Sequence, residues 1–424
     1  MKKSLILLNF LLLLSIFSCN MPTPQKNLSD RENQTAVPET KAATELVSND
    51  VSSINKLQKQ EKTKTAYYEY FFVIAKSGLN YRESPKGKVI GMFYLNTNLK
   101  VIKKTSLFEQ IIDGDSTING EWVGVEKGKD TVYVFNAYLS ESPLISNVKI
   151  FQATPFYRYT GSSENGFINL SEVYFKNEEL EKAILQGDDL PDTIILNAKQ
   201  RALFLRRAEI SESDSVYLYD VKTGDIFIYK VNDLPALARI NTYFNENEYE
   251  KEESDFEFGF DLGKTYKNGY DNFVFIGKEN PFIKGKLKPI VWKEIDLGLF
   301  KRKFNKIKEF EPYLSRKTSM VYLYQYDNFD FYFLDKQELI VVDVDKKSIV
   351  YSDYVHSDEG STPTRLVMED DAKSGNEQSQ WTGILFKNKP PVIFGFYSYS
   401  FSCEGISFLN RSEPPLGILC DCRH

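Results

Sequence analysis

The first folded part of this 424-residue chain opens with Val73-Ile74-Ala75-Lys76-Ser77-Gly78-Leu79-Asn80-Tyr81-Arg82-Glu83-Ser84-Pro85. Apolar and polar residues alternate along this stretch, and Gly78 and Pro85 supply turn residues. Alternation between turn residues is typical of short antiparallel strands. Similar short runs continue to Ser140, namely Val89–Gly91, Leu95–Val101, Glu121–Val125, Val132–Val134 and Ala137–Ser140. We therefore expect a small β domain over residues 67–142.

The alternation assigns the side chains of this domain to two faces. The predicted inward positions are Leu79, Tyr81, Val89, Leu99 and Val101. These residues would line a small barrel, in which Trp122 supplies the largest single burial. Asn80 and Arg82 are the polar members of the stretch, and two interpretations remain open for them. They either brace the long loop through side-chain to backbone hydrogen bonds or line a peptide groove.

The segment Leu79-Asn80-Tyr81-Arg82 with the Ser84-Pro85 turn resembles the opening of bacterial SH3 (SH3b) domains, where a strand runs into Leu-Asn-Val-Arg. Tyr81 takes the usual Val position, and Val132 stands where a Gly commonly precedes the aromatic residue. A longer loop is expected between Ser106 and Asn119. The resemblance implies an SH3-like barrel that targets a protein to cell-wall peptides. It implies that the ligand-binding residues are Asn80, Tyr81, Arg82, Trp122 and Tyr133.

The N-terminus has the pattern of an export signal. Lys2 and Lys3 precede an apolar run from Leu5 to Phe17, which as a helix of about 20 Å is too short to span ~30 Å of hydrocarbon. Ser18-Cys19 ends the run and resembles the relaxed lipobox of spirochaete lipoproteins. That resemblance implies a signal peptide over residues 1–18, lipidation at Cys19, and anchoring in the cell envelope, on the periplasmic face or the surface of an outer membrane. The alternative is an ordinary secretory signal in which Cys19 is incidental.

Residues 19–66 are predicted to form a disordered tether. From Asn20 to Ala66 there is no aromatic residue, and small polar and charged residues dominate. Such a composition cannot bury enough apolar surface to offset the chain entropy lost on folding. The tether would hold the folded domains clear of a membrane surface.

Residues 143–424 read as a larger antiparallel β domain of no recognised family. Short β-rich runs include Ala202–Leu205, and two hairpins are expected: Val216–Asp220 with Asp225–Val231, and Glu338–Val344 with Ile349–Tyr354. Helices are expected only at Glu178–Leu185 and Leu299–Phe310. The fold class is therefore mainly β, with a propeller-like array as the alternative to an irregular antiparallel arrangement.

Composition excludes several kinds of chemistry. The net charge of −6 argues against nucleic acid as a partner, because phosphate binding needs clustered Lys and Arg. The two histidines, His356 and His424, leave few candidates for a His-based active site, and no cofactor or catalytic pair is predicted. In an oxidising compartment Cys403 is expected to form a disulfide with Cys420 or Cys422. A Cys₃His zinc site that adds His424 is the alternative to this pairing.

These observations predict a non-catalytic, lipid-anchored envelope protein. Its partners would be the membrane, through Cys19, and peptidoglycan or envelope proteins, through the SH3b domain. Two alternatives remain open, a surface-exposed adhesin-like binding protein and a hydrolase of cell-wall polymers that uses carboxylates of the C-terminal domain.

Overall fold

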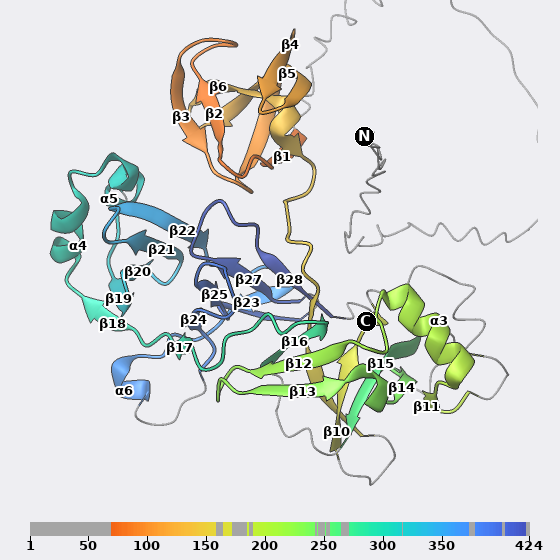
Figure 1. Ribbon diagram of the computed structural model, residues 1–424. Coiled ribbons are helices and arrows are strands. Elements are labelled where there is room, and N and C mark those ends of the chain that lie inside the picture. Colours follow the sequence, from red (N-terminus) through yellow and green to blue (C-terminus); the bar gives the residue numbers. More distant parts are fainter. Residues whose placement is uncertain are drawn as a thin grey trace, which may run out of the picture.

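The computed structural model describes residues 69–157, 164–171, 185, 190–241, 244, 251, 255–263, 271–315, 317–372, 378–400 and 403–420. The signal-like segment, Cys19 and the predicted tether lie outside the described residues. So do Cys422, His424 and all but the last residue of the helix predicted over Glu178–Leu185. The described part is mainly β, as predicted (Figure 1).

Residues 69–140 form a sheet of their own, which Figure 1 shows at one end of the molecule. Its seven strands are antiparallel and follow the order β3-β2-β6-β5-β4-β1-β7. The strands are β1 (Glu69–Val73), β2 (Leu79–Arg82), β3 (Val89–Phe93), β4 (Asn98–Asp113), β5 (Ser116–Lys127), β6 (Asp130–Phe135) and β7 (Leu139–Ser140), with a 3-10 turn, η2 (Asn136–Tyr138), before β7. Its core consists of Val73, Leu79, Leu99, Val101, Val123, Val125, Val132 and Val134, with Tyr81 packed against them.

The prediction that Val89 points into the core is wrong. Val89 is 40% exposed, whereas Leu79, Leu99 and Val101 are buried as expected. The reason is a bulge, because Tyr81 pairs with Gly91 but Arg82 pairs with Val89, so that β3 carries one extra residue. An extra residue moves the following side chains to the other face of a strand.

The prediction of a long loop between Ser106 and Asn119 is also wrong. β4 and β5 continue through it as a two-stranded ribbon, and they reverse direction at Gly114 and Asp115. Gly114 has a φ of 58°, the left-handed conformation that a two-residue hairpin turn requires. The ribbon therefore projects beyond the rest of the sheet.

The remaining described residues form four sheets, joined to the first by residues 141–149. One five-stranded sheet has the order β11 (Thr193–Ile195), β14 (Ala236–Ile240), β15 (Phe256–Gly263), β10 (Glu164–Asn169), β9 (Ala153–Tyr157). The nine-stranded sheet has the order β13 (Ile226–Lys230), β12 (Ser215–Asp220), β16 (Asn272–Gly277), β8 (Ile150–Phe151), β28 (Leu416–Leu419), β27 (Gly405–Phe408), β25 (Val392–Phe394), β24 (Trp381–Gly383), β17 (Leu287–Pro289). The other two consist of β18 (Lys293–Ile295), β19 (Val321–Tyr326), β20 (Phe329–Leu334), β21 (Glu338–Asp343), β22 (Ser348–Tyr354), and of β23 (Ser361–Pro363) with β26 (Tyr397–Tyr399).

The strand order decides between the two predicted architectures. The described sheets are unequal and do not repeat as four-stranded propeller blades, so the irregular antiparallel arrangement holds. Both predicted hairpins are confirmed, by the pairing of β12 with β13 and of β21 with β22. β28 runs parallel to β8 and pairs Ile418 with Ile150, so the end of this region returns to its beginning.

The helices correct the sequence-based prediction in two places. The described helical segments are α3 (Ala198–Ala208), α4 (Leu297–Phe304), α5 (Glu311–Leu314), α6 (Glu369–Ala372), and the 3-10 turns η3 (Val231–Asp233) and η5 (Lys308–Phe310). Ala202–Leu205 lies within α3 and is not a strand. A capping box between Asn197 and Gln200 begins this helix, which buries Phe204 against Phe260. The helix predicted over Leu299–Phe310 ends at Phe304 and resumes as η5.

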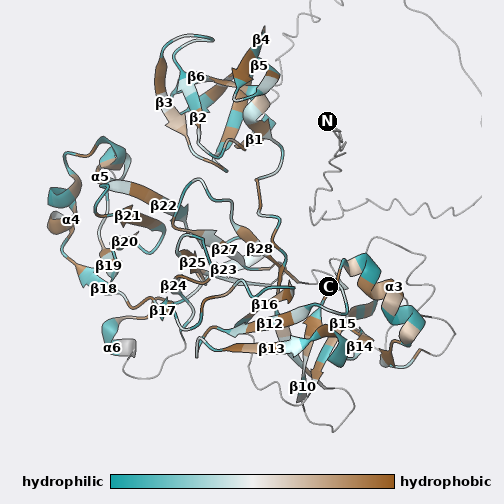
Figure 2. Ribbon diagram, viewed as in Figure 1, coloured by the Kyte–Doolittle hydropathy of each residue, from teal (hydrophilic) through white to brown (hydrophobic). Residues whose placement is uncertain are grey.

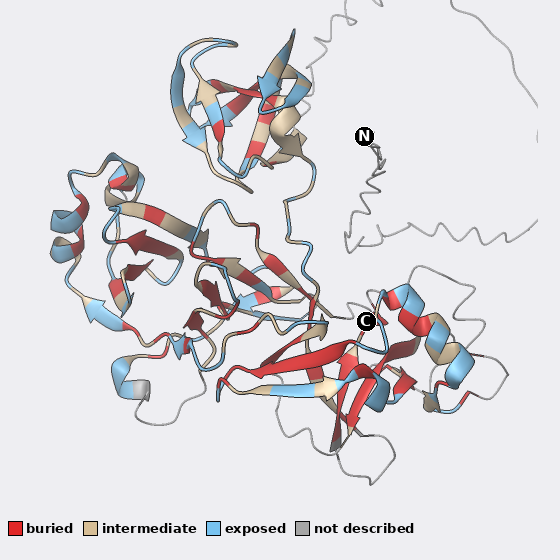
Figure 3. Ribbon diagram, in the orientation of Figure 1, coloured by how far each residue is buried: buried red, intermediate tan, exposed pale blue. Residues whose placement is uncertain are grey.

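Figure 3 shows where the cores lie. β12, β14, β15, β20 and β21 are buried along most of their length, whereas α3 and α4 alternate buried and exposed turns. Figure 2 shows the same strands as largely apolar and α4 as largely hydrophilic. The larger region therefore contains several cores beneath its sheets, whereas the N-terminal sheet has one.

Candidate functional site

Four of the five predicted ligand-binding residues, all except Tyr81, lie on the outer face of the N-terminal sheet. Arg82 of β2 pairs with Tyr133 of β6, Tyr133 pairs with Gly124 of β5, and Gly124 pairs with Lys103 of β4. Residues paired directly across antiparallel strands project to the same face. Arg82, Tyr133 and Lys103 thus form one row across four strands, which we call the outer row. Trp122 lies on the same face, opposite Phe135.

Gly124 sets the spacing of the outer row. A Cβ atom at this position would lie 3.1 Å from Cβ of Lys103 and 3.5 Å from Cε1 of Tyr133. The missing side chain lets Tyr133 and Lys103 approach each other over β5. The ammonium of Lys103 lies 5.9 Å from the centroid of the Tyr133 ring, within the range of a cation–π contact.

Trp122 is buried, as predicted, but it does not lie inside the barrel. Its side chain is on the outer face, only 6% exposed, because the projecting ribbon and Arg82 cover it. The indole Nε1–H donates to Oε2 of Glu109 at 2.7 Å, and the Arg82 guanidinium lies 5.5 Å from the ring centroid. Trp122 therefore fastens the ribbon to the sheet and has little surface left for a ligand.

Arg82 braces the turn that follows β2, whereas the sequence interpretation assigns its bracing contact to the long loop. Its Nη1 donates to the backbone oxygen of Gly87 at 2.6 Å, across the turn that follows β2. The guanidinium is half-buried between this carbonyl and Trp122. Its remaining exposed edge still belongs to the outer row, so bracing and ligand binding are compatible at this residue.

Tyr81 is separated from the outer row. Strand alternation places it on the inner face with Leu79, where its ring lies across Gly91 and packs on Phe93 at a centroid distance of 4.6 Å. The ammonium of Lys127 approaches this ring to 5.4 Å. Asn80 shares the outer side of β2 with Arg82 and is exposed. Tyr81 is thus the one predicted ligand-binding residue that the structure does not place with the others.

The charges around the outer row are mostly paired. Lys86 forms an ion pair with Glu109 at 3.3 Å, and Lys104 forms one with Glu69 at 3.4 Å. The hydrogen bond from Trp122, assisted by Lys86, holds the pKa of Glu109 below its usual value. Within the described residues Lys103 forms no ion pair. The outer row therefore keeps one available cation beside an aromatic ring.

Sequence reasoning missed two features of this face. Lys103 and Glu109 become neighbours of the predicted residues through cross-strand pairing, which a linear pattern does not reveal. The projecting ribbon also leaves Phe108 73% exposed and Ile112 82% exposed, on either side of a hydrogen bond from Gln110 to Asn119. The other face of its tip is fastened by the hydroxyl of Tyr138, which donates to Asp113 at 2.6 Å.

A small junction links the N-terminal sheet to the rest of the molecule. Arg411 lies over the ring of Tyr94 at 3.9 Å and donates to Glu309 at 2.5 Å, and the Tyr94 hydroxyl donates to the same carboxylate at 3.2 Å. Burial is the main reason that the pKa of Tyr94 is raised. A cleft of about 470 Å³ adjoins these residues, but its charged side chains are already paired, Asp343 with Lys346 and Arg411 with Glu309. We therefore interpret the junction as a structural contact.

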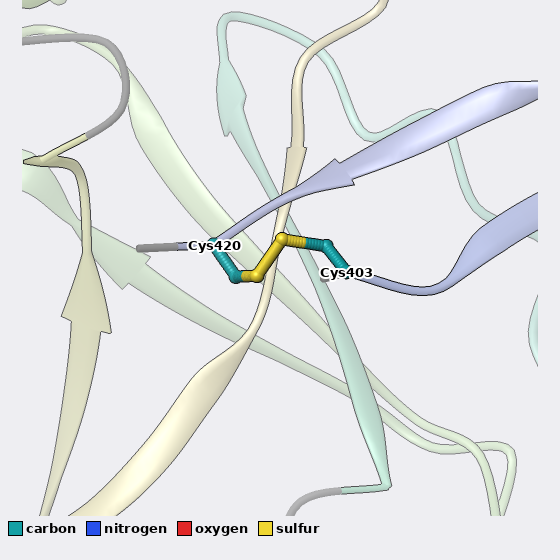
Figure 4. The surroundings of a disulfide bond; sticks show 2 residues. All are labelled: Cys403 and Cys420. Carbon is teal, nitrogen blue, oxygen red and sulfur yellow. A yellow bond between two sulfur atoms is a disulfide. The ribbon is translucent and has the colours of Figure 1, made fainter. Parts of the chain in front are cut away.

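The predicted cysteine pairing is resolved in favour of Cys403 and Cys420. These residues form a disulfide with a Cα–Cα distance of 5.9 Å, beside β27 and β28 (Figure 4). The alternative zinc site would need Cys422 and His424, which lie outside the described residues. In the part of the chain that the structure describes, no cluster of three or more His, Cys, Asp or Glu side chains could hold a metal ion. No helix among the described residues is long and apolar enough to cross a membrane.

No protein-family model, curated protein or solved structure matches the chain.

Proposed function

We propose that the chain is a lipid-anchored cell-envelope protein whose N-terminal β domain, of the SH3b type, binds a peptide-like ligand, and we take this ligand to be a peptidoglycan stem peptide. The lipid anchor would be carried by Cys19, and the tether would let the domain reach its ligand. The protein acts as a binding module in this proposal and not as an enzyme.

The observation that carries the proposal is the outer row. Tyr133 offers a ring face on which a peptide plane can pack, and it lies between the guanidinium of Arg82 and the ammonium of Lys103. Cations on both sides of an aromatic ring suit a peptide that ends in, or branches to, a carboxylate, because Lys and Arg donate charge-assisted hydrogen bonds to carboxylates. Stem peptides of the cell wall have such carboxylates.

The experiment is co-sedimentation of the full chain with isolated peptidoglycan sacculi. The test variant combines Lys103→Gln with Tyr133→Leu, which removes the free cation and the ring while sparing Arg82 and Trp122, whose contacts hold the turn and the ribbon. The matched control is Lys104→Gln, one residue away and already paired with Glu69. We expect the test variant to lose most of its binding and the control to retain it.

The same samples are assayed for soluble muropeptides. Binding without release supports the binding module. Release of fragments by the unaltered chain would instead support the carboxylate hydrolase. Binding that does not change in the test variant would show that the ligand binds at a surface other than the outer row. Circular dichroism of each variant confirms that the fold is retained.

A further inference from the structure

A cavity of about 230 Å³ lies in the C-terminal region, far from the outer row in the fold. The start of β16, the end of β25, the beginning of β26 and the segment before β24 enclose it. Its walls include the rings of Phe273, Trp381, Phe394 and Tyr397 and two carboxylates, Asp271 and Glu404. A Cβ at Gly395 would lie 1.9 Å from the backbone oxygen of Ser379, so this wall can only be built with glycine.

Glu404 lacks the partners that an enclosed carboxylate usually has. Its Oε1 is shielded from solvent and has no hydrogen-bond partner among the described residues. The backbone N–H of Gly395 is the group that favours its ionised form. Of the described residues that line the cavity, none is Lys, Arg or His. A buried oxygen without a partner is costly, so it marks a place where another group fits.

The neighbouring titratable groups do not supply that partner. Asp271 adds negative charge and is itself paired with Lys222, at 2.6 Å. Tyr397 directs its hydroxyl to the backbone oxygen of Tyr354 and toward Asp353, and Tyr399 interacts with Glu404 only through the charge of the carboxylate. Burial therefore raises the pKa of Glu404 to about 7, with Asp271 adding to the effect.

We propose that this cavity binds a small cationic amine, of the kind that a lysine-like side chain carries, with Glu404 as its counter-ion. An ammonium group offers three N–H donors and a positive charge, which are the two things that the Glu404 carboxylate lacks. The aromatic walls attract cations through their ring faces.

The experiment uses the full chain and two probes of equal shape, n-butylammonium and the neutral n-butanol, in isothermal titration calorimetry. We expect n-butylammonium to bind with a dissociation constant on the order of 1 mM at about pH 8, where Glu404 is ionised. At about pH 5 the affinity should fall at least tenfold, because protonated Glu404 carries no charge. Between these values, binding should release a proton, which two buffers of different ionisation enthalpy reveal.

Glu404→Gln keeps the shape of the side chain and removes its charge, so it should weaken n-butylammonium binding at least about tenfold at the higher pH. Glu279→Gln is the matched control, since Glu279 is exposed and does not line the cavity. Equal binding of butanol and butylammonium would overturn the proposal, and so would an affinity that does not change with pH. Absence of binding by the unaltered chain would overturn it as well. The first two comparisons need no variant and stay decisive even where Glu404→Gln folds poorly.

Discussion

Two glutamates, one in the N-terminal sheet and one in the C-terminal cavity, occupy opposite environments. Glu109 accepts the indole N–H of Trp122 and pairs with Lys86, so its pKa lies below the usual value. Among the described residues that line the cavity Glu404 has no cation beside it, and burial raises its pKa to about 7. The same type of side chain therefore holds the ribbon to the sheet in one region and is proposed to bind a ligand in the other. The difference lies in which partners the fold provides, and it can be tested by changes in each of the two regions.

The largest expected effect comes from Trp122→Ala in the N-terminal sheet. Removing this covered ring should cost about 4 kcal/mol of unfolding free energy, because a cavity remains behind and Glu109 loses the indole hydrogen bond. Urea denaturation followed by circular dichroism measures the loss. Trp122→Phe is the control, since it keeps most of the ring and loses only the indole N–H. Equal stability of Trp122→Ala and the unaltered chain would show that the ribbon is not fastened here.

In the C-terminal region the disulfide next to Glu404 should have the second largest effect. Closing a chain segment with a sequence separation of 17 is worth about 3 kcal/mol, so Cys403→Ser with Cys420→Ser should lower the unfolding free energy by about that amount. Thermal unfolding with and without reductant provides the measurement. Cys422→Ser is the matched control and should leave stability unchanged. A reverse result, with Cys422→Ser destabilising, would assign the disulfide to Cys422.

The pH dependence of stability should separate the two glutamates. The pKa of Glu404 is raised from 4.5 to about 7 in the folded state, so its contribution is fully present below pH 4.5 and is lost as the pH rises through about 7. The loss amounts to at most about 3 kcal/mol. Glu404→Gln should therefore flatten the stability profile between about pH 5 and pH 8. A profile that is identical in both proteins would mean that Glu404 is not enclosed in solution.

Glu109 should give the smallest effect and the opposite sign. Its lowered pKa stabilises the fold above the usual value of 4.5, and this contribution is lost as the pH falls through the folded-state pKa. Glu109→Gln should thus be slightly less stable than the unaltered chain at neutral pH and equally stable in acid. Titration of the Glu109 carboxyl by NMR measures the shift directly, and Trp122→Phe should move it back toward 4.5. A Glu109 pKa that stays the same in Trp122→Phe would contradict the hydrogen bond from Trp122 to Glu109.

Much of the local structure could be predicted from the sequence. Alternation placed Leu79, Leu99 and Val101 in a core, and turn residues between β-rich runs identified both hairpins. Prediction failed where a local pattern is ambiguous or where pairing changes it. Ala202–Leu205 is too short an apolar run to distinguish helix from strand, and the capping box at Asn197 decided for the helix. Val89 was assigned to the wrong face because a bulge is visible only in the register of β2 and β3.

The candidate sites show the same division more sharply. Arg82, Trp122 and Tyr133 stand out in the sequence, yet their roles differ once Glu109 and Lys103 are beside them. Glu404 carries no recognisable motif and is one of 59 acidic residues. Its setting arises because Asp271, more than a hundred residues earlier in the chain, lines the same cavity as Trp381, Gly395 and Glu404.

The sequence by itself determined that the chain is mainly β, which segments alternate, and which cysteines are available to pair. These properties depend on periodicity and residue type, which are local. Only the tertiary structure decided that Trp122 is covered by a ribbon, that Tyr81 faces away from Tyr133, and that no described Lys, Arg or His lines the cavity around Glu404. Burial and cross-strand neighbours determine those outcomes, because the free energy of a charge or a ring depends on what surrounds it after folding.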